Sequence, residues 1–340
     1  MVKKFFGVEE KGSTVGTEVI AGIATFLAMA YIIVVNPAIL SQTGMSFSGV
    51  LFATVIVCTF SSIAMGLYAN LPFALAPGMG INAFFTYTLV LGMKVPWETA
   101  LGAVFISGII FLILSIFKVR TTIVKAVPSS IRYAVAAGIG LFLTLIGFEQ
   151  VGFIVQNPAT VVSFGGFSLK VILFLVGLFI TSILVIKKIK GNLVLGIIIT
   201  SIISLIVSSI GVATGKLEAP LVTPPKGVFA LPSLEVFLKL DIVGALKWSM
   251  IGPIFALLFT DMFDSISTFL GVAQVAGLID KDGQPVNVGK ALLVDAGATT
   301  ISGLVGTSSG TTYIESAAGV EEGGRTGLTA VVTGLLFIPF

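Results

Sequence analysis

Carboxylates inside apolar runs are the side chains of this sequence that could do chemistry. They are Glu18, Asp261, Asp264, Asp295 and Glu315. An ionisable group in such surroundings is costly, and it usually faces the interior of a helix bundle or a water-filled cavity. The chain has 340 residues and no histidine. A histidine metal site and a histidine proton relay are therefore excluded, and proton chemistry falls to the carboxylates.

Asp261 and Asp264 lie three residues apart in the stretch LLFTDMFDSIST, which places them on one face of a helix. Two carboxylates so close in a low dielectric do not easily both ionise, so one of them should hold a proton. Such a pair suits a proton that is taken up and released. For either aspartate alone, a structural hydrogen bond is the alternative. For Asp295 a structural and a direct role are both open, and Glu18 is expected at the membrane interface.

Glu315 follows a run of small polar residues, GTSSGTTYI, and precedes SAAGV. We expect it at the start of a half-helix, where free N–H groups and a partial positive charge favour an anion. Asn82 occupies a similar place in APGMGINAFF, because an isoleucine precedes it just as Ile314 precedes Glu315. Carboxylates, an amide and exposed backbone would suit a neutral, flat ligand that carries both donors and acceptors.

The elements that hold these residues are membrane helices. Hydrophobic residues make up 56% of the chain, charged residues only 10%, and the mean hydropathy is +1.11. A soluble domain carries about 25% charged residues, and about 20 apolar residues cross a bilayer. The fold class is therefore an all-α polytopic membrane protein. The single cysteine, Cys58, excludes an intramolecular disulfide, and the net charge of +3 does not indicate a nucleic-acid partner.

We predict eleven spans. Nine are ordinary, near residues 17–40, 48–69, 98–117, 131–148, 169–186, 192–212, 248–272, 288–305 and from 327 onward. Two are interrupted, at 71–92 and 306–320. With the N-terminus inside, the outer segments hold six of the 19 basic residues, namely Lys94, Lys170, Lys216, Lys226, Lys239 and Lys247. The other 13 fall inside, which predicts a cytoplasmic N-terminus.

The interrupted spans predict an inverted repeat. The offset in residue number that carries Asn82 to Glu315 also carries Tyr31 to Asp264. An odd number of spans separates the equivalents, so the second copy is inverted. Broken helices at matching places mark the binding site of a transporter near the midplane. The alternative is that Gly and Pro only kink two ordinary helices. Two halves of this length exceed 340 residues, so we expect about eleven of fourteen spans here.

The stretches TEVIAGIATFLAMAYIIVVNP, NLPFALAPGMGINAFFTYT, TDMFDSIST and SSGTTYIESAAGVEEGGRTGLTA resemble the nucleobase–ascorbate transporter family, in its azaguanine-transporter-like purine permease branch. The resemblance implies a 7+7 inverted repeat with strand-plus-half-helix spans 3 and 10. It implies a core domain at residues 1–117 and 247–340 and a gate domain at 118–246. It also implies proton symport, a homodimer and a place in the cytoplasmic membrane, with no cofactor and no metal.

By motif, the resemblance places the substrate site at Glu315, the Ile314 backbone, Ser316, Asn82 and the backbone near Gly80. The carboxylate of span 8 falls on Asp264, or on Asp261 in the opposite assignment. Proton coupling falls to these aspartates and Glu315. Relatives that carry uracil or xanthine tend to have Asn where this chain has Ser316, which implies guanine, hypoxanthine or adenine as the substrate.

Three other functions fit these residues less well. A uracil or xanthine transporter and an inorganic-anion transporter would share the fold, but an acidic Glu315 disfavours an anion. An intramembrane aspartyl protease needs its two aspartates on different helices, whereas Asp261 and Asp264 are three residues apart on one. We therefore expect a transporter rather than an enzyme.

Overall fold

The computed structural model describes residues 2–117, 129–158, 160–187, 189, 191–214, 217, 220–221, 232–279 and 286–340. Some of the basic residues behind the predicted orientation lie outside these ranges, namely Lys118, Arg120, Lys125, Lys188, Lys190, Lys216, Lys226 and Lys281. The chain forms two compact units, the first from residues 1–134 and 231–340 and the second from residues 135–230.

Seven helices among the described residues are long and apolar enough to cross a membrane. They are Val15–Thr43, Phe47–Ala69, Trp97–Ile116, Leu169–Ile186, Asn192–Ala213, Trp248–Ala276 and Val288–Val305. Each matches a predicted span to within a few residues. The first interrupted span contains a shorter apolar helical stretch, Met79–Gly92, and the second contains only the short helix Ser316–Glu321. The span predicted from 327 onward is a helix over Gly327–Phe337, which is shorter than the seven.

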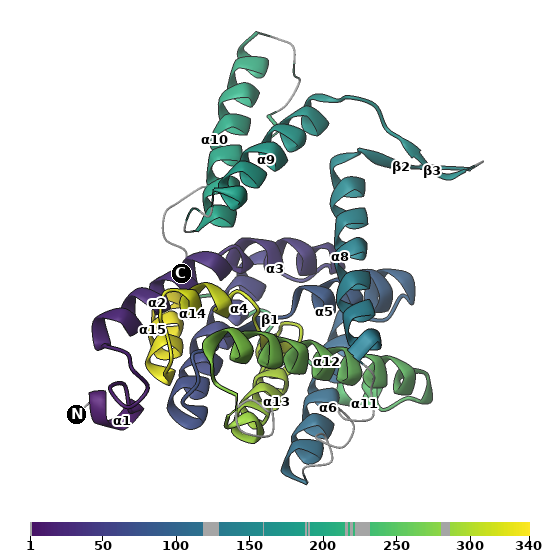
Figure 1. The fold of residues 1–340 in the computed structure, drawn as a ribbon. Coiled ribbons are helices and arrows are strands. Elements are labelled where there is room, and N and C mark those ends of the chain that lie inside the picture. The colour runs from purple at the N-terminus through teal and green to yellow at the C-terminus, as the bar shows by residue number, and fades with distance from the viewer. Residues whose placement is uncertain are drawn as a thin grey trace. The chain divides into compact units, whose positions relative to one another are not determined.

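The first unit is built from helices and two short strands (Figure 1). Its helices in the first third of the chain are α1 (Val2–Phe6), α2 (Val15–Met29), α3 (Ile32–Leu40), α4 (Phe47–Ala64), α5 (Met79–Ala83) and α6 (Trp97–Ile116). Those in the last third are α11 (Ile242–Ala245), α12 (Ile251–Ala276), α13 (Val288–Val305), α14 (Ser316–Glu321) and α15 (Gly327–Phe337). π-Helical turns extend α4 over Met65–Ala69 and α5 over Phe84–Gly92.

The second unit holds most of α8 (Ser129–Val151), whose residues 129–134 belong to the first unit. It also holds a hairpin of β2 (Ile154–Asn157) and β3 (Val161–Phe164), and helices α9 (Leu169–Ile186) and α10 (Asn192–Ala213). Helices α9 and α10 pack through reciprocal glycine–threonine contacts. A Cβ at Gly177 would lie 2.5 Å from Thr200, and one at Gly196 would lie 2.2 Å from Thr181. Small residues of this kind let membrane helices approach closely.

Side-chain caps set where several helices begin. Thr14 and Ser46 accept backbone N–H groups at the starts of α2 and α4. Asp241 accepts the Gly244 N–H at 2.9 Å at the start of α11, and this bond holds the pKa of Asp241 below its ordinary value. A two-residue turn, Ala30 and Tyr31, separates α2 from α3, so Tyr31 lies where the helix is interrupted.

Two three-residue strands pair at the centre of the first unit. Strand β1 (Leu75–Pro77) runs antiparallel to β4 (Gly310–Thr312), with Leu75 opposite Thr312 and Pro77 opposite Gly310. Further bonds extend the ladder, from Gly78 N–H to the Ser309 carbonyl and from Tyr313 N–H to the Ala74 carbonyl, both at 2.9 Å. Helix α5 begins just after Gly78 and α14 begins just after Glu315. The predicted strand-plus-half-helix form of spans 3 and 10 is confirmed.

The repeat is visible in the anchors of these strands. The Leu75 N–H donates to Ser62 Oγ and the Thr312 N–H donates to Asp295 Oδ1, each at 3.0 Å. The offset from Ser62 to Asp295 equals the offset that the sequence predicted for the repeat, whereas the offset between the anchored residues, Leu75 and Thr312, is four residues longer. Asp295 is therefore a strand anchor, and its counterpart in the first half is a serine.

The half-helices follow the offset less closely. Helix α5 begins at Met79, whose counterpart by the offset is Thr312, yet α14 begins only at Ser316. Asn82 consequently lies inside α5, whereas Glu315 is the cap before α14. The expected equivalence of Asn82 and Glu315 is thus wrong by about one helical turn, because the chain enters the two half-helices differently.

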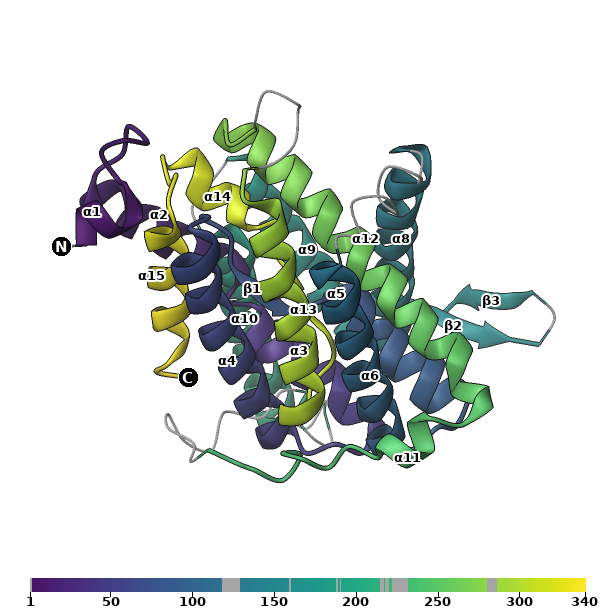
Figure 2. The same ribbon diagram turned by 90° about the horizontal axis from the view of Figure 1, so that it is seen from below.

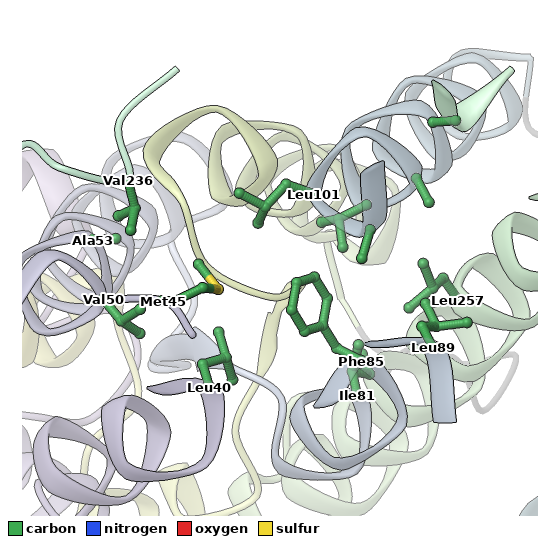
Figure 3. Close-up of a cluster of buried hydrophobic side chains, with 14 of the residues drawn as sticks. Leu40, Met45, Val50, Ala53, Ile81, Phe85, Leu89, Leu101, Val236 and Leu257 are labelled. Atoms are coloured by element: carbon green, nitrogen blue, oxygen red, sulfur yellow. The ribbon is translucent and has the colours of Figure 1, made fainter. Parts of the chain in front are cut away.

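An apolar core packs α3, α4, α5, α6 and α12 together, with Phe85 and Leu101 fully buried (Figure 3). Helix α13 lies against α6 and α4 (Figure 2). It approaches α6 so closely that a Cβ at Gly108 would lie 2.6 Å from the Thr300 backbone nitrogen. Similar contacts bring α15 onto the π-helical end of α4, since a Cβ at Gly327 would lie 2.0 Å from the Gly66 carbonyl oxygen.

The α6–α13 contact predicts opposite effects for two equal substitutions. Gly108→Ala should lower the melting temperature in detergent, since backbone must move by several tenths of an ångström and such overpacking costs about 1–3 kcal/mol. Gly297→Ala, with nothing within 4 Å of the new methyl group, should hold or raise it. Equal melting temperatures for the two variants would contradict the packing described.

Candidate functional site

Glu315 lies where β4 gives way to α14, and its side chain is half-buried. The Tyr31 hydroxyl donates to Glu315 Oε1 at 2.6 Å. The other carboxylate oxygen, Oε2, accepts no hydrogen bond from another residue that the structure describes. Neighbouring Ile314 is 63% exposed, which is unusual for an isoleucine beside a strand crossing. Together these place an acceptor oxygen and an exposed apolar side chain side by side at the junction of β4 and α14.

Asp264 is the second carboxylate that remains accessible. It is half-buried on α12 and makes no hydrogen bond to any residue that the structure describes. The Asp264 carboxylate is close enough to the carboxylates of Glu315 and Asp295 for their charges to interact. Asp264 is also close enough to the Tyr31 hydroxyl for an electrostatic interaction. A carboxylate this enclosed normally has a hydrogen-bond partner, so Asp264 is available to a ligand or a proton.

Asp261 faces a different neighbour. Its side chain is only 1% exposed, and the Thr299 hydroxyl lies 2.5 Å from Asp261 Oδ2. That hydroxyl is also 3.0 Å from the Gly310 carbonyl oxygen, so Asp261 helps to join α12, α13 and β4. A spacing of three residues rotates the second aspartate by about 60° around a helix, which is enough to separate the two environments. Asp261 and Asp264 therefore have different surroundings, although the spacing places them on one helix.

The side chains of Asn82 and Ser316 are hydrogen-bonded to other parts of the protein. Asn82 is fully buried, and its Oδ1 accepts a short hydrogen bond from the Ser308 hydroxyl. Ser316 is also fully buried, and its Oγ accepts the Ala74 N–H at 3.0 Å, beside β1. Gly80 lies in the first turn of α5 and is half-exposed. The paired strands β1 and β4 thus bring the segments of these residues together, although Asn82 and Ser316 have no exposed surface.

Glu18, which the sequence places near the membrane interface, is enclosed by protein. Its side chain is fully buried, and it accepts N–H groups from Arg325 and Thr326 and the hydroxyl hydrogen of Thr329. The start of α15 supplies these donors, which the linear position of Glu18 at the edge of an apolar run could not reveal. A buried carboxylate is tolerated when such donors replace water.

The sequence analysis did not identify several polar side chains around the paired strands β1 and β4. Tyr313 donates to the Pro77 carbonyl at 2.6 Å, and Ser265 and Thr311 share a hydrogen bond of 2.7 Å. Asn36 donates to Thr54 and Thr307. The run of hydroxyls in GTSSGTT was the available signal, because buried hydroxyls need partners from other helices. Tyr31 appeared in the sequence only as the repeat counterpart of Asp264.

The chemistry open to this region is hydrogen bonding and proton uptake. Among the described residues, no group of three or more histidine, cysteine, aspartate or glutamate side chains could hold a metal ion. Glu315 Oε2 and Asp264 can accept N–H donors when ionised, and either carboxyl can donate when protonated. Ile314 offers an apolar contact beside them. Such a set suits a small polar molecule with an apolar face.

Comparison with known proteins matches residues 16–340 to the model of the Permease family, the xanthine/uracil permeases. The adenine permease AdeP of Escherichia coli is 42% identical, over 99% of this chain and 74% of the relative. The guanine/hypoxanthine permease GhxP of Escherichia coli O157:H7 is 40% identical, over 98% and 74%. The guanine/hypoxanthine permease PbuO of Bacillus subtilis is 37% identical, over 98% and 76%.

Two solved structures share the fold at low sequence identity. The transmembrane domain of a cyanobacterium bicarbonate transporter, BicA, superposes with a TM-score of 0.64 at 16% identity, over 95% of this chain and 81% of that one. The structure of SLC26A9 gives a TM-score of 0.60 at 10% identity, over 95% and 53%. The likeness supports the inverted-repeat transporter fold that the sequence predicted.

The anchoring role of Asp295 can be tested by stability. Asp295→Ala leaves the Thr312 N–H and hydroxyl without their acceptor, and an unsatisfied buried donor costs about 1–3 kcal/mol. The melting temperature in detergent should fall accordingly. Asp295→Asn keeps an acceptor at Oδ1 and should lose less. If the alanine variant melts like the unchanged protein, Asp295 is not needed to hold β4.

Proposed function

Because the chain belongs to the xanthine/uracil permease family, we propose that it carries purine nucleobases across a membrane. The substrate class is supported by relatives named as adenine permease and as guanine/hypoxanthine permeases, which match almost the whole chain. The protein is a transporter with multiple membrane passes rather than an enzyme. Guanine, hypoxanthine and adenine are the proposed substrates.

The observation that carries the site assignment is that two neighbouring carboxylates retain free acceptor capacity. Glu315 Oε2 and the whole Asp264 carboxyl accept no hydrogen bond from another residue in the described part of the chain. We propose that both accept N–H groups of the purine ring. Ile314 and the backbone around Gly80 border the ligand, since both are accessible.

The remaining predicted residues have a supporting part in this proposal. Asn82, Ser316 and Asp261 hold Ser308, the Ala74 N–H and Thr299 respectively. They fix the two strands and α12 around the site, and through them the positions of Glu315 and Asp264. Of the two aspartates between which the sequence left the choice open, we propose Asp264 for ligand contact.

Proton coupling is proposed for the same two carboxylates. Asp264 and Glu315 are close enough for their charges to repel in a low dielectric, so loading a proton onto Asp264 relieves this repulsion. Transport of a neutral nucleobase together with that proton would be driven by the proton gradient. If one substitution at Asp264 abolished both nucleobase transport and proton transport, the two would be coupled.

Domain roles and assembly complete the proposal. Residues 1–117 and 247–340 would form the core domain that holds the substrate, and residues 118–246 the gate domain. We further propose a cytoplasmic N-terminus, a place in the cytoplasmic membrane and a homodimer, from the distribution of basic residues and the family resemblance.

Uptake measurements test the site. In cells that lack their own purine permeases, Asp264→Asn and Glu315→Gln should each reduce uptake of labelled guanine, hypoxanthine or adenine at least tenfold. A hydrogen bond to a charged group is worth about 1.5–3 kcal/mol, which corresponds to about 10- to 100-fold in affinity. Glu149→Gln, at an exposed position near the end of α8, is the control and should transport normally. Normal uptake by both site variants would refute the assignment.

Proton coupling has a separate signature at Asp264. Asn cannot take up a proton, so Asp264→Asn should lose accumulation driven by an inward proton gradient in proteoliposomes. Exchange of labelled for unlabelled nucleobase needs no net proton movement and should be less affected. If Asp264→Asn still accumulates substrate in response to the gradient, the proton is carried elsewhere.

A further inference from the structure

Glu18 is a buried charge that substrate binding and proton uptake do not use. Its Oε1 accepts the Arg325 N–H at 3.0 Å, and its Oε2 accepts the Thr326 N–H at 3.2 Å and the Thr329 hydroxyl at 2.6 Å. Three donors surround a carboxylate whose residue is fully buried. The site of these bonds is the N-terminus of α15, where orphan N–H groups favour a negative charge.

The same residue ties α2 to the turn that follows α14. Arg325 donates its guanidinium to the Val320 and Gly324 carbonyls at 2.7 and 2.8 Å, and so closes the end of α14, while its backbone N–H is held by Glu18. Lys11 donates to the Arg325 carbonyl at 3.4 Å and adds a second link to this turn. The α14–α15 turn is therefore fixed from the α2 side.

Between its ends, α14 lies directly on α2, as Figure 1 shows. A Cβ at Gly319 would lie 2.2 Å from Thr25 Oγ1 and 2.5 Å from the Ala21 carbonyl oxygen, so the α14 backbone touches α2. At the other end Tyr31 donates to Glu315. Tyr31 follows Glu18 by 13 residues, a helical rise of about 20 Å. The two helices are thus joined at both ends.

We propose that Glu18 is a positioning residue for the ligand site. By tying the α14–α15 turn to α2 it holds α14 in place, and with it the Glu315 carboxylate at the opposite end of that short helix. The inference rests on the proposed function, since it is Glu315 that would contact the nucleobase. Glu18 would thus contribute to substrate affinity although it does not touch the substrate. A purely structural role of its hydrogen bonds would not predict such a contribution.

Hydrogen exchange on the ligand-free protein tests the tie itself. Glu18→Gln loses the charge and one acceptor oxygen, and should speed amide exchange in residues 313–322 while leaving α9 and α10 unchanged. Thr329→Val removes one of the three donors and should give a smaller change in the same segment. It keeps the test possible if Glu18→Gln does not fold. Unchanged exchange in residues 313–322 in both variants would overturn the proposal.

Affinity measurements separate positioning from a local structural role. Glu18→Gln should weaken nucleobase binding about tenfold and Thr329→Val about threefold. The control is Ser46→Ala, which removes the hydroxyl that caps the start of α4 and has no contact with Glu18. It should lower the melting temperature yet change affinity less than twofold. Equal affinity losses in Glu18→Gln and Ser46→Ala at equal melting temperatures would point to general destabilisation and overturn the proposal.

A double-mutant cycle adds a readout that local effects do not move. Glu18 and Tyr31 share no partner, so independent effects would multiply. If both residues act through the position of Glu315, Glu18→Gln combined with Tyr31→Phe should bind no more weakly than the more affected single variant. If the affinity loss of the double variant equals the product of the two single losses, the two residues do not act through the position of Glu315 together. If the unchanged protein binds no nucleobase, the proposed function fails, while the exchange experiment still reports on the tie.

Discussion

The pairing of two three-residue strands inside an apolar bundle is the constraint on which the rest of the structure depends. No water can satisfy backbone groups in the hydrocarbon region, so extended chain is tolerated there only if its N–H and C=O groups find partners within the protein. Each strand supplies partners for the other, and Ser62 and Asp295 complete the ladder from neighbouring helices. Both interrupted spans must therefore meet at one place, and the two half-helices must begin there.

This constraint sorts the polar residues of the first unit. Those that satisfy strands or join helices, such as Asp261 and Asn82, are fully enclosed. Asp264 and Glu315 remain accessible beside the paired strands, and Glu315 accepts a hydrogen bond from Tyr31. Asp261 is used within the protein, whereas Asp264 and Glu315 keep unused acceptor oxygens among the described residues. Composition does not separate these three residues, because all are acids in similar apolar runs.

The sequence was sufficient for the spans, the interrupted helices and the family, because these depend on local composition and on short motifs. The repeat offset found in the sequence also reappears in the anchors Ser62 and Asp295. What it could not supply were contacts set by tertiary packing. Tyr31 and Glu315 are 284 residues apart, and Glu18 and Arg325 are 307 apart. The differing roles of Asp261 and Asp264 depend on which face of α12 meets α13, and a spacing of three residues does not specify this.

The close glycine contacts beside the site set where this chain can accept added side-chain volume. Gly319 against α2 and Gly327 against Gly66 leave no room for even one added carbon. At Gly319 any added side chain would move the short helix that Glu315 precedes. Ile314, which is 63% exposed, has no such restriction on its outer side. The two sides of Glu315 therefore differ in plasticity: one is closed to substitution by backbone contact, and the other can change its shape while the backbone stays in place.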